Sequence, residues 1–159
     1  MEPLIRVQNL MKIYNPGENE VRALDDVSLD IGQGEFVAII GQSGSGKSTF
    51  MNMLGCLDVP TSGNYYLNGK DVSNMTDDEL SDVRNVEIGF IFQGFNLIPN
   101  LTVRENIEVG AYLSDRPLDV DELLQTLGLY EHRKKLPNQL SGGQQQRTAI
   151  GRAIVKNPD

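Results

Sequence analysis

The sequence lacks the features that mark secreted, membrane-spanning or nucleic-acid-binding proteins. Its 159 residues include a single cysteine, Cys56, so no internal disulfide can form, and this favours a reducing, cytoplasmic setting. No apolar run approaches the roughly eighteen residues that a membrane-crossing helix needs. The first ten residues, MEPLIRVQNL, lack a basic region followed by an apolar stretch. We therefore expect no secretory signal.

Basic residues are also scarce. The chain has 14 Lys and Arg against 22 Asp and Glu, and its formal net charge is −8. A nucleic-acid-binding protein usually carries a basic face, so nucleic acid is not an expected partner. Six acidic residues fall within 71–87, where Arg84 is the one basic residue. This run is interpreted as the solvated face of a helix, with an acidic docking surface as the alternative.

The first part of the chain has mainly strand patterns. Residues 4–14 and 21–31 alternate between apolar and polar, and "NPGEN" supplies a turn between them. The apolar, branched run "EFVAII" at 35–40 predicts a strand buried on both faces, as in a parallel sheet. A helix pattern follows it at once, and "NYYLNG" at 64–69 predicts a further short strand.

Helices are predicted mainly in the second part. Capping boxes, in which a short polar side chain and a Glu or Gln three residues later satisfy free backbone N–H groups, predict three helix starts. "DVDELLQTLGL" predicts another helix that ends near Gly128, and "EIGFIF" at 87–92 predicts a strand. One domain is expected, with a sheet core at 1–92 and a helical part at 93–159. The three boxes are Thr76 with Glu79, Thr102 with Glu105, and Ser141 with Gln144.

One motif carries recognisable chemistry. "GQSGSGKS" at 41–48 fits the phosphate-binding pattern G-x-x-x-x-G-K-[ST] and lies between a predicted strand and a predicted helix. Its glycines let successive backbone N–H groups converge on phosphate oxygens, and the helix start adds its positive dipole end. Lys47 brings a full charge to the outer phosphates, and the Ser48 hydroxyl suits Mg²⁺. The alternative is a flexible Gly/Ser turn that happens to hold a lysine. The predicted ATP-binding residues here are Gly41, Gln42, Ser43, Gly44, Ser45, Gly46, Lys47, Ser48 and Thr49.

A second motif, "LSGGQ" at 140–144, follows the phosphate-binding loop, and with both motifs the chain resembles the ATP-binding-cassette (ABC) ATPases. The resemblance covers all 159 residues. "GCLDVPTSGNYYLNGKDVS" and "IFQGFNLIPNLTVRENI" are most similar to the branch of macrolide exporters and lipoprotein-releasing complexes. It implies an α/β fold: a P-loop NTPase sheet core with an antiparallel β subdomain and a helical subdomain, without the C-terminal part of the family's domain.

The resemblance also implies roles for residues outside the phosphate loop. Tyr14 takes the place of the aromatic that stacks on adenine, with a strand-edge aromatic as the ordinary alternative. Gln93 resembles the family glutamine that joins core and helical subdomain and contacts the metal. Ser141, Gly142, Gly143 and Gln144 would face the γ-phosphate held by a second ATPase subunit in a head-to-tail dimer; the alternative is an ordinary capped helix.

The implied function is the ATPase subunit of an exporter or releasing complex, peripheral on the inner face of the cell membrane and bound to a transmembrane permease. The family's water-activating Glu, metal-orienting Asp and switch His would all follow Asp159. Residues 1–159 are therefore expected to bind ATP without hydrolysing it at a useful rate. The alternatives are a nucleotide-binding module with no turnover and a soluble cassette ATPase outside transport. His132, the only histidine, does not match the switch and is expected to be a solvated surface residue.

Overall fold

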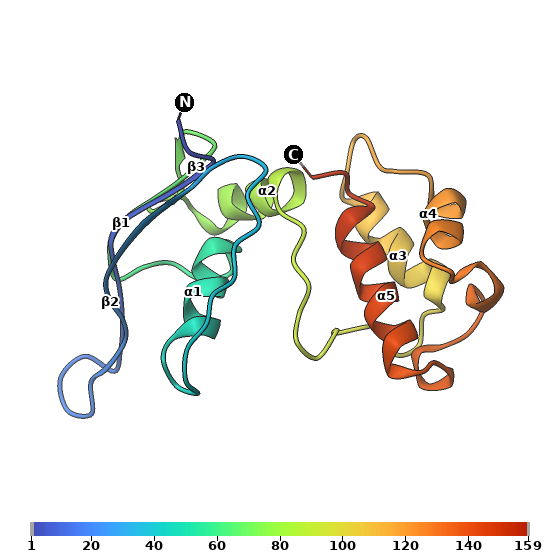
Figure 1. Ribbon diagram of the computed structural model, residues 1–159, viewed down its shortest axis with the longest axis horizontal. Helices are drawn as coiled ribbons and strands as arrows, with labels where there is room; N and C mark the ends of the chain where they lie inside the picture. Colours follow the sequence, from blue (N-terminus) through green and yellow to red (C-terminus); the bar gives the residue numbers. More distant parts are fainter. Residues whose placement is uncertain (1, 159) are drawn as a thin grey trace. The chain divides into compact units, whose positions relative to one another are not determined.

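The computed structural model describes residues 2–158, and the chain divides into two compact units, Met1–Ser81 and Asp82–Asp159 (Figure 1). The first unit is built on a four-stranded antiparallel sheet with the order β2-β1-β3-β4. The predicted strands at 4–14, 21–31 and 64–69 are confirmed, with small shifts at their ends. The strands are β1 Ile5–Tyr14, β2 Val21–Ile31, β3 Ser62–Leu67 and β4 Lys70–Asp71.

A bulge in β1 sets which side chains reach the core of this unit. Val7 and Leu10 are both fully buried, although residues three apart on a regular strand face opposite sides. The register shifts between them, and Asn9 has a φ of 49°. An extra residue of this kind rotates the strand, so both apolar side chains pack inward. Helix α1, Lys47–Leu54, contacts β2 and adds Phe50 and Met53 to the core.

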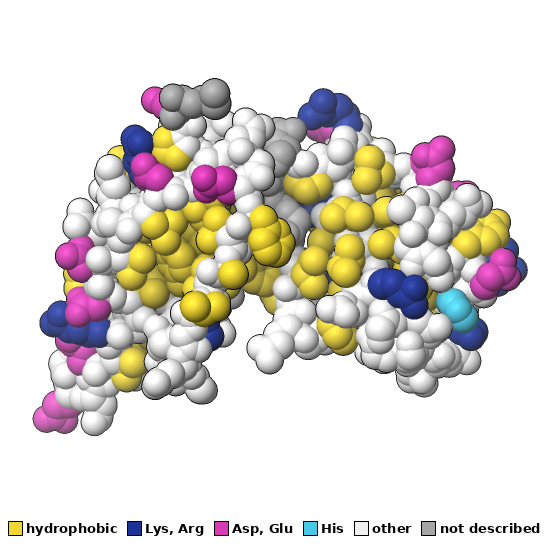
Figure 2. Space-filling model, viewed as in Figure 1, with side chains coloured by type: hydrophobic (Ala, Val, Ile, Leu, Met, Phe, Trp, Pro, Cys, Tyr) yellow, Lys and Arg dark blue, Asp and Glu magenta, His cyan; other side chains and the backbone are white. Residues whose placement is uncertain are grey.

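The predicted strand at 35–40 is wrong. This segment joins no ladder with the described strands, and the Phe36 and Ile40 side chains are 99% and 90% exposed. Figure 2 shows apolar side chains gathered on the visible face of the first unit. The apolar pattern predicted burial on two faces, but a strand exists only where a neighbour completes its hydrogen bonds. None of the described residues supplies that neighbour.

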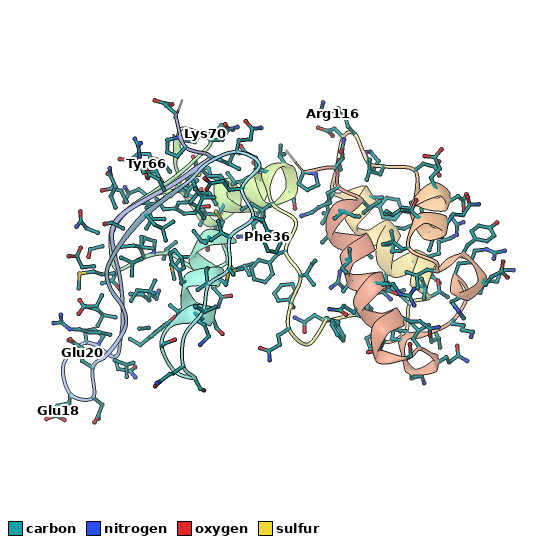
Figure 3. All side chains as sticks on the ribbon, viewed as in Figure 1. Glu18, Glu20, Phe36, Tyr66, Lys70 and Arg116 are labelled. Atoms are coloured by element: carbon teal, nitrogen blue, oxygen red, sulfur yellow. The ribbon has the colours of Figure 1, made fainter. Side chains whose placement is uncertain are left out.

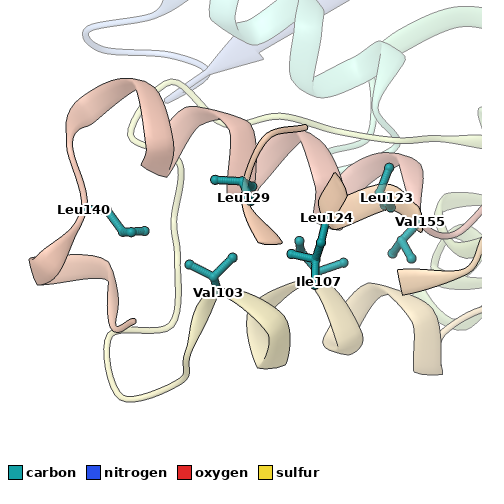
Figure 4. Packing of buried hydrophobic residues seen from close by; sticks show 7 residues of the cluster. All are labelled: Val103, Ile107, Leu123, Leu124, Leu129, Leu140 and Val155. Atoms are coloured by element: carbon teal, nitrogen blue, oxygen red, sulfur yellow. The ribbon is translucent and has the colours of Figure 1, made fainter. Parts of the chain in front are cut away.

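The second unit is helical. Its core lies between α3 Val103–Tyr112, α4 Val120–Thr126 and α5 Gly142–Ile154. α3 and α5 approach closely because Gly110 has no side chain: a Cβ there would lie 2.3 Å from the carbonyl oxygen of Arg152. Figure 4 shows the buried cluster, which consists of Val103, Ile107, Leu123, Leu124, Leu129, Leu140 and Val155.

All three predicted capping boxes form. Each first helix turn is closed by reciprocal hydrogen bonds between a hydroxyl residue and a Glu or Gln. The first of these helices, α2 Asp77–Glu87, carries three exposed acidic residues in its first turn, which agrees with the interpretation of a solvated face. Short 3-10 turns at Tyr130–His132 and Pro137–Gln139 lead into α5.

The predicted strand at 87–92 is also wrong. Glu87 is the last residue of α2, and residues 88–92 form no ladder within the described part of the chain. As at 35–40, the strand was predicted from the apolar composition of the segment alone. A strand forms only when a second strand elsewhere in the chain pairs with it. No helix within residues 2–158 is both long and apolar enough to span a bilayer.

Candidate nucleotide site

The phosphate-binding loop leads into α1 through glycines in a conformation that other residues rarely adopt. Gly44 and Gly46 have φ values of 79° and 93°. Gly46 is the N-cap of α1, and because it has no side chain, no side-chain acceptor satisfies the first N–H groups of this helix. The helices α2, α3, α4 and α5 each have such an acceptor. The amide donors at the start of α1 therefore remain available to an anion.

Strand β2 holds this loop in place. A Cβ on Gly46 would lie 2.2 Å from the carbonyl oxygen of Ala23, so only glycine fits against the strand here. Gly44, by contrast, has no atom within 4 Å of where its Cβ would be. The loop is thus packed on one side and open on the other.

The ammonium group of Lys47 folds back over the loop. Its Nζ donates to the carbonyl oxygens of Gly41 and Gln42 at 2.7 and 2.6 Å and to Ser45 Oγ at 3.2 Å. These acceptors hold the charge against the loop backbone. A phosphate at the loop would add a stronger, charge-assisted partner for the same ammonium.

An open cavity of about 520 Å³ lies over this loop. Six of the predicted residues line it, from Ser43 through Thr49 with Ser45 left out; Gly41 and Gln42 shape the loop but do not line the cavity. Three residues that the motif did not indicate complete the wall: Val21, Arg22 and Ala23 of β2. The motif held no signal for them, because the contact of β2 with the loop joins two separate segments of the chain.

Charge at this edge of the cavity is partly neutralised. Arg22 Nε donates to Glu20 Oε1 at 2.9 Å, and Glu20 lies on the turn between β1 and β2 (Figure 3). The hydrogen bond from Arg22 to Glu20 raises the pKa of the guanidinium further above its already high value. Arg22 is thus a permanent cation at the cavity wall, held by the acidic turn.

Tyr14 ends β1 directly opposite Val21 in the ladder, so its backbone is one strand away from the cavity wall. Its side chain does not line the cavity. The residue is 39% exposed, and its hydroxyl donates to Asp58 Oδ2 at 3.2 Å. The first unit therefore brings Tyr14 and the phosphate loop to neighbouring positions.

Gln93 lies in the second unit, on an exposed loop after residues 88–92. The next turn is constrained: Phe95 and Asn96 both have positive φ, and Arg152 of α5 donates to their two carbonyl oxygens at 2.6 and 2.7 Å. Burial lowers the pKa of this Arg152, which stays charged at any ordinary pH. The loop that carries Gln93 is thus attached to the helix that begins at "LSGGQ".

The "LSGGQ" segment forms a helix start with an uncovered surface. Ser141 Oγ accepts from Gln144 N at 3.2 Å, and Gln144 Oε1 accepts from Ser141 N at 2.9 Å. A Cβ on Gly142 or Gly143 would meet no described atom within 4 Å. Close packing inside this chain therefore does not explain the two glycines, which leave the first turn of α5 bare.

His132 is not the solvated residue that the polar stretch predicted. Its Nε2 lies 3.2 Å from Gln144 Nε2, and its Nδ1 is buried without a partner among the described residues. The polar residues around it are mostly exposed, but the 3-10 turn directs the imidazole inward against α5. Sequence periodicity held no signal for this contact, because it joins a short 3-10 turn to the first turn of α5.

The residues at the phosphate loop suit a metal ion that binds together with a nucleotide. In residues 2–158 no group of three or more His, Cys, Asp or Glu side chains could hold an ion by itself. Mg²⁺ is commonly bound by one or two protein ligands together with phosphate oxygens and water. Ser48 is exposed, lines the cavity and offers one hard oxygen of this kind.

The glycine loop, the open α1 amides and the lysine define the class: this is a P-loop nucleotide-binding protein. The sequence profile of the family "ABC transporter" matches residues 24–159. The chain belongs to the ABC transporter family, and the resemblance predicted from the two motifs is confirmed.

Known relatives of the chain belong to the same family. The chain is 50% identical to the macrolide export ATP-binding/permease protein MacB of Hyphomonas neptunium, over 99% of this chain and 25% of that protein. It is 47% identical to the uncharacterized ABC transporter ATP-binding protein YknY of Bacillus subtilis, over 98% and 70%. The chain thus spans a quarter of some curated relatives and less than three quarters of others.

Solved structures show the same fold. The chain superposes on the dimeric structure of MJ0796, a bacterial ABC transporter cassette, with a TM-score of 0.89 and 45% identity, covering 97% of this chain and 70% of that one. A second structure, of the MJ0796 cassette in a post-hydrolysis state bound to ADP and Pi, also has a TM-score of 0.89, with 44% identity. The mixed α/β cassette fold predicted from the sequence is therefore confirmed.

Proposed function

We propose that the chain provides the ATP-binding part of an ATPase subunit that drives export or release of a substrate through a membrane permease. The observation that carries this proposal is the phosphate loop, with Lys47 and the uncapped start of α1 facing one cavity. Backbone N–H groups and the ammonium would hold the phosphates, and Ser48 with Gln93 would contact the metal. Bound Mg²⁺ would neutralise charge on the outer phosphates.

The "LSGGQ" segment is proposed to face ATP held by a second subunit in a head-to-tail dimer. Its support is the bare first turn of α5, where two glycines leave space that none of the residues 2–158 fills. The positive end of a capped helix suits a γ-phosphate. The similar MJ0796 cassette is dimeric.

We assign the permease contact to the segment "NLIPNLTVRENI", because it resembles the family segment that faces the transmembrane partner. Its backbone is fixed by Asn106, which is fully buried and bonds to the carbonyl oxygens of Ile98, Leu101 and Thr102 and to the Ile98 N–H. A fixed loop can transmit a displacement of α5, through Arg152, to whatever it contacts. A permease partner would hold the subunit on the inner face of the membrane.

Turnover is proposed to need residues beyond Asp159. Nothing in the described phosphate site takes the place of a carboxylate that positions water, and a positioned general base typically contributes about 10²–10⁴ in rate. The decisive assay compares phosphate release by this chain, by a version extended through the native downstream sequence, and by the extended version with Lys47→Ala. We expect release from the extended version alone. Lys47-dependent release by residues 1–159 would contradict the proposal.

The same extended version tests the dimer. Ser141→Ala should leave ATP binding by the monomer unchanged, while ATP-driven dimerisation, followed by light scattering, and turnover both fall. Thr102→Ala is the matched control, because it removes the same capping interaction from α3, which is not part of the proposed dimer interface. Dimerisation that responds equally to the two changes would indicate a stability effect and not a contact with the second nucleotide.

A further inference from the structure

Two side chains of the first unit converge on one carboxylate, that of Asp58. Lys12 and Tyr14 are two residues apart on β1 and reach Asp58, which follows α1. Asp58 Oδ1 accepts from Lys12 Nζ at 2.9 Å, and Oδ2 accepts from the Tyr14 hydroxyl at 3.2 Å. Lys12 Nζ also lies over the Tyr14 ring, 5.2 Å from its centroid. The ring is thus restrained at its edge by a hydrogen bond and at one face by a cation.

The carboxylate itself is firmly held. Oδ1 also accepts from the Val59 N–H at 2.7 Å, and Lys12 Nζ donates a second hydrogen bond, to the Val59 carbonyl, at 2.8 Å. Burial alone would raise the pKa of Asp58, but the hydrogen bonds from Lys12 and Val59 outweigh it and keep the pKa below its usual range. Asp58 therefore stays ionised at neutral pH and accepts from both partners.

Asp58 is tied to the phosphate loop through α1. Directly after that helix, Gly55 N donates to Met51 O at 2.8 Å and Leu57 N donates to Asn52 O at 2.9 Å. Cys56 between them is buried. The loop, α1 and residues 55–59 therefore form one hydrogen-bonded run that ends at the Tyr14 hydroxyl. The position of the ring is set relative to the phosphate cradle.

We propose that Asp58 is a positioning residue for the adenine of ATP: it fixes the Tyr14 ring, supported by Lys12, as a preformed stacking platform at a set distance from the phosphate loop. Tyr14 is 39% exposed as a residue while two contacts restrain its ring. A side chain already ordered loses less conformational entropy when a base stacks on it, which strengthens binding. The proposal rests on the proposed function, since a platform matters only if ATP binds here.

The test measures affinity for ATP and for inorganic triphosphate by calorimetry on the full chain. Tyr14→Phe removes only the hydroxyl, and Asp58→Asn removes the charge that holds it. Each should weaken ATP by about two- to tenfold, the range for losing the order of one side chain, and leave triphosphate unchanged. The double variant should bind ATP no more weakly than Asp58→Asn alone, because both changes break one hydrogen bond. Asp78→Asn, which removes the same charge from an exposed site on α2, is the control and should match the parent.

Failure of the role of Asp58 and failure of ATP binding by the chain would give different results. If Tyr14→Ala selectively weakens ATP while Tyr14→Phe and Asp58→Asn bind as the parent does, the platform stands and the role of Asp58 is overturned. Equal weakening of ATP and triphosphate in Asp58→Asn would also overturn it, because the residue would then act on the cradle or the fold. A parent chain that binds neither ligand would refute the proposed function itself.

Discussion

At the scale of single residues, the phosphate loop depends on two glycines for different reasons. Gly44 and Gly46 share a positive φ, but only Gly46 lies against another strand, where a Cβ would meet the Ala23 carbonyl oxygen at 2.2 Å. Substitution of Gly44 therefore tests backbone strain alone, and substitution of Gly46 tests strain together with packing against β2. The lysine between loop and helix is different again, because it contributes charge and not shape.

Gly44→Ala should lower the free energy of unfolding by about 1 kcal/mol, the cost of one non-glycine residue in the left-handed region. Gly46→Ala adds an overlap with β2 to the same strain and should cost about 3 kcal/mol or more. Urea denaturation of the two variants measures the difference. Equal losses would show that the contact between the loop and β2 contributes nothing.

At the scale of elements, structure that depends on a few consecutive residues could be predicted from the sequence, and contacts between separate segments could not. The capping boxes at Thr76, Thr102 and Ser141 depend on four consecutive residues, so the sequence contains all that forms them. The strands expected at 35–40 and 87–92 depend on a neighbour far along the chain, and their apolar composition says nothing about its presence. The β2 wall of the cavity and the contact of His132 with Gln144 were missed for the same reason.

Replacing Asn106 tests how far one side chain stabilises the loop at 98–102. It is fully buried and makes four hydrogen bonds to that loop's backbone, so Asn106→Ala would leave several polar groups without partners. The expected loss is about 2–3 kcal/mol in the free energy of unfolding. Asn138→Ala changes an exposed asparagine in the same unit and should stay within about 0.5 kcal/mol. A loss that does not exceed this control would contradict the fixed loop.

At the scale of the whole molecule, the residues predicted to contact ATP are divided between the two units. Tyr14 and the phosphate loop belong to the first unit, and Gln93 and the "LSGGQ" helix belong to the second. Each half is preformed within its own unit: glycines and Lys47 shape the first, and the capping box with Arg152 shapes the second. In the proposed function ATP joins such halves across two subunits, so every other proposal depends on nucleotide binding.

Titration of ATP into the chain by calorimetry, with Lys47→Ala and Lys134→Ala measured beside it, is therefore the most direct test. Lys47 bonds to exposed loop carbonyl oxygens, so its removal should spare the fold while a full charge at the phosphates is lost. Lys134 is an exposed lysine of the second unit and controls for the change in net charge. We predict binding by the parent and by Lys134→Ala, and no measurable binding by Lys47→Ala. An affinity of Lys47→Ala within about threefold of the parent, a difference of less than 1 kcal/mol, would contradict the assignment of the phosphate site.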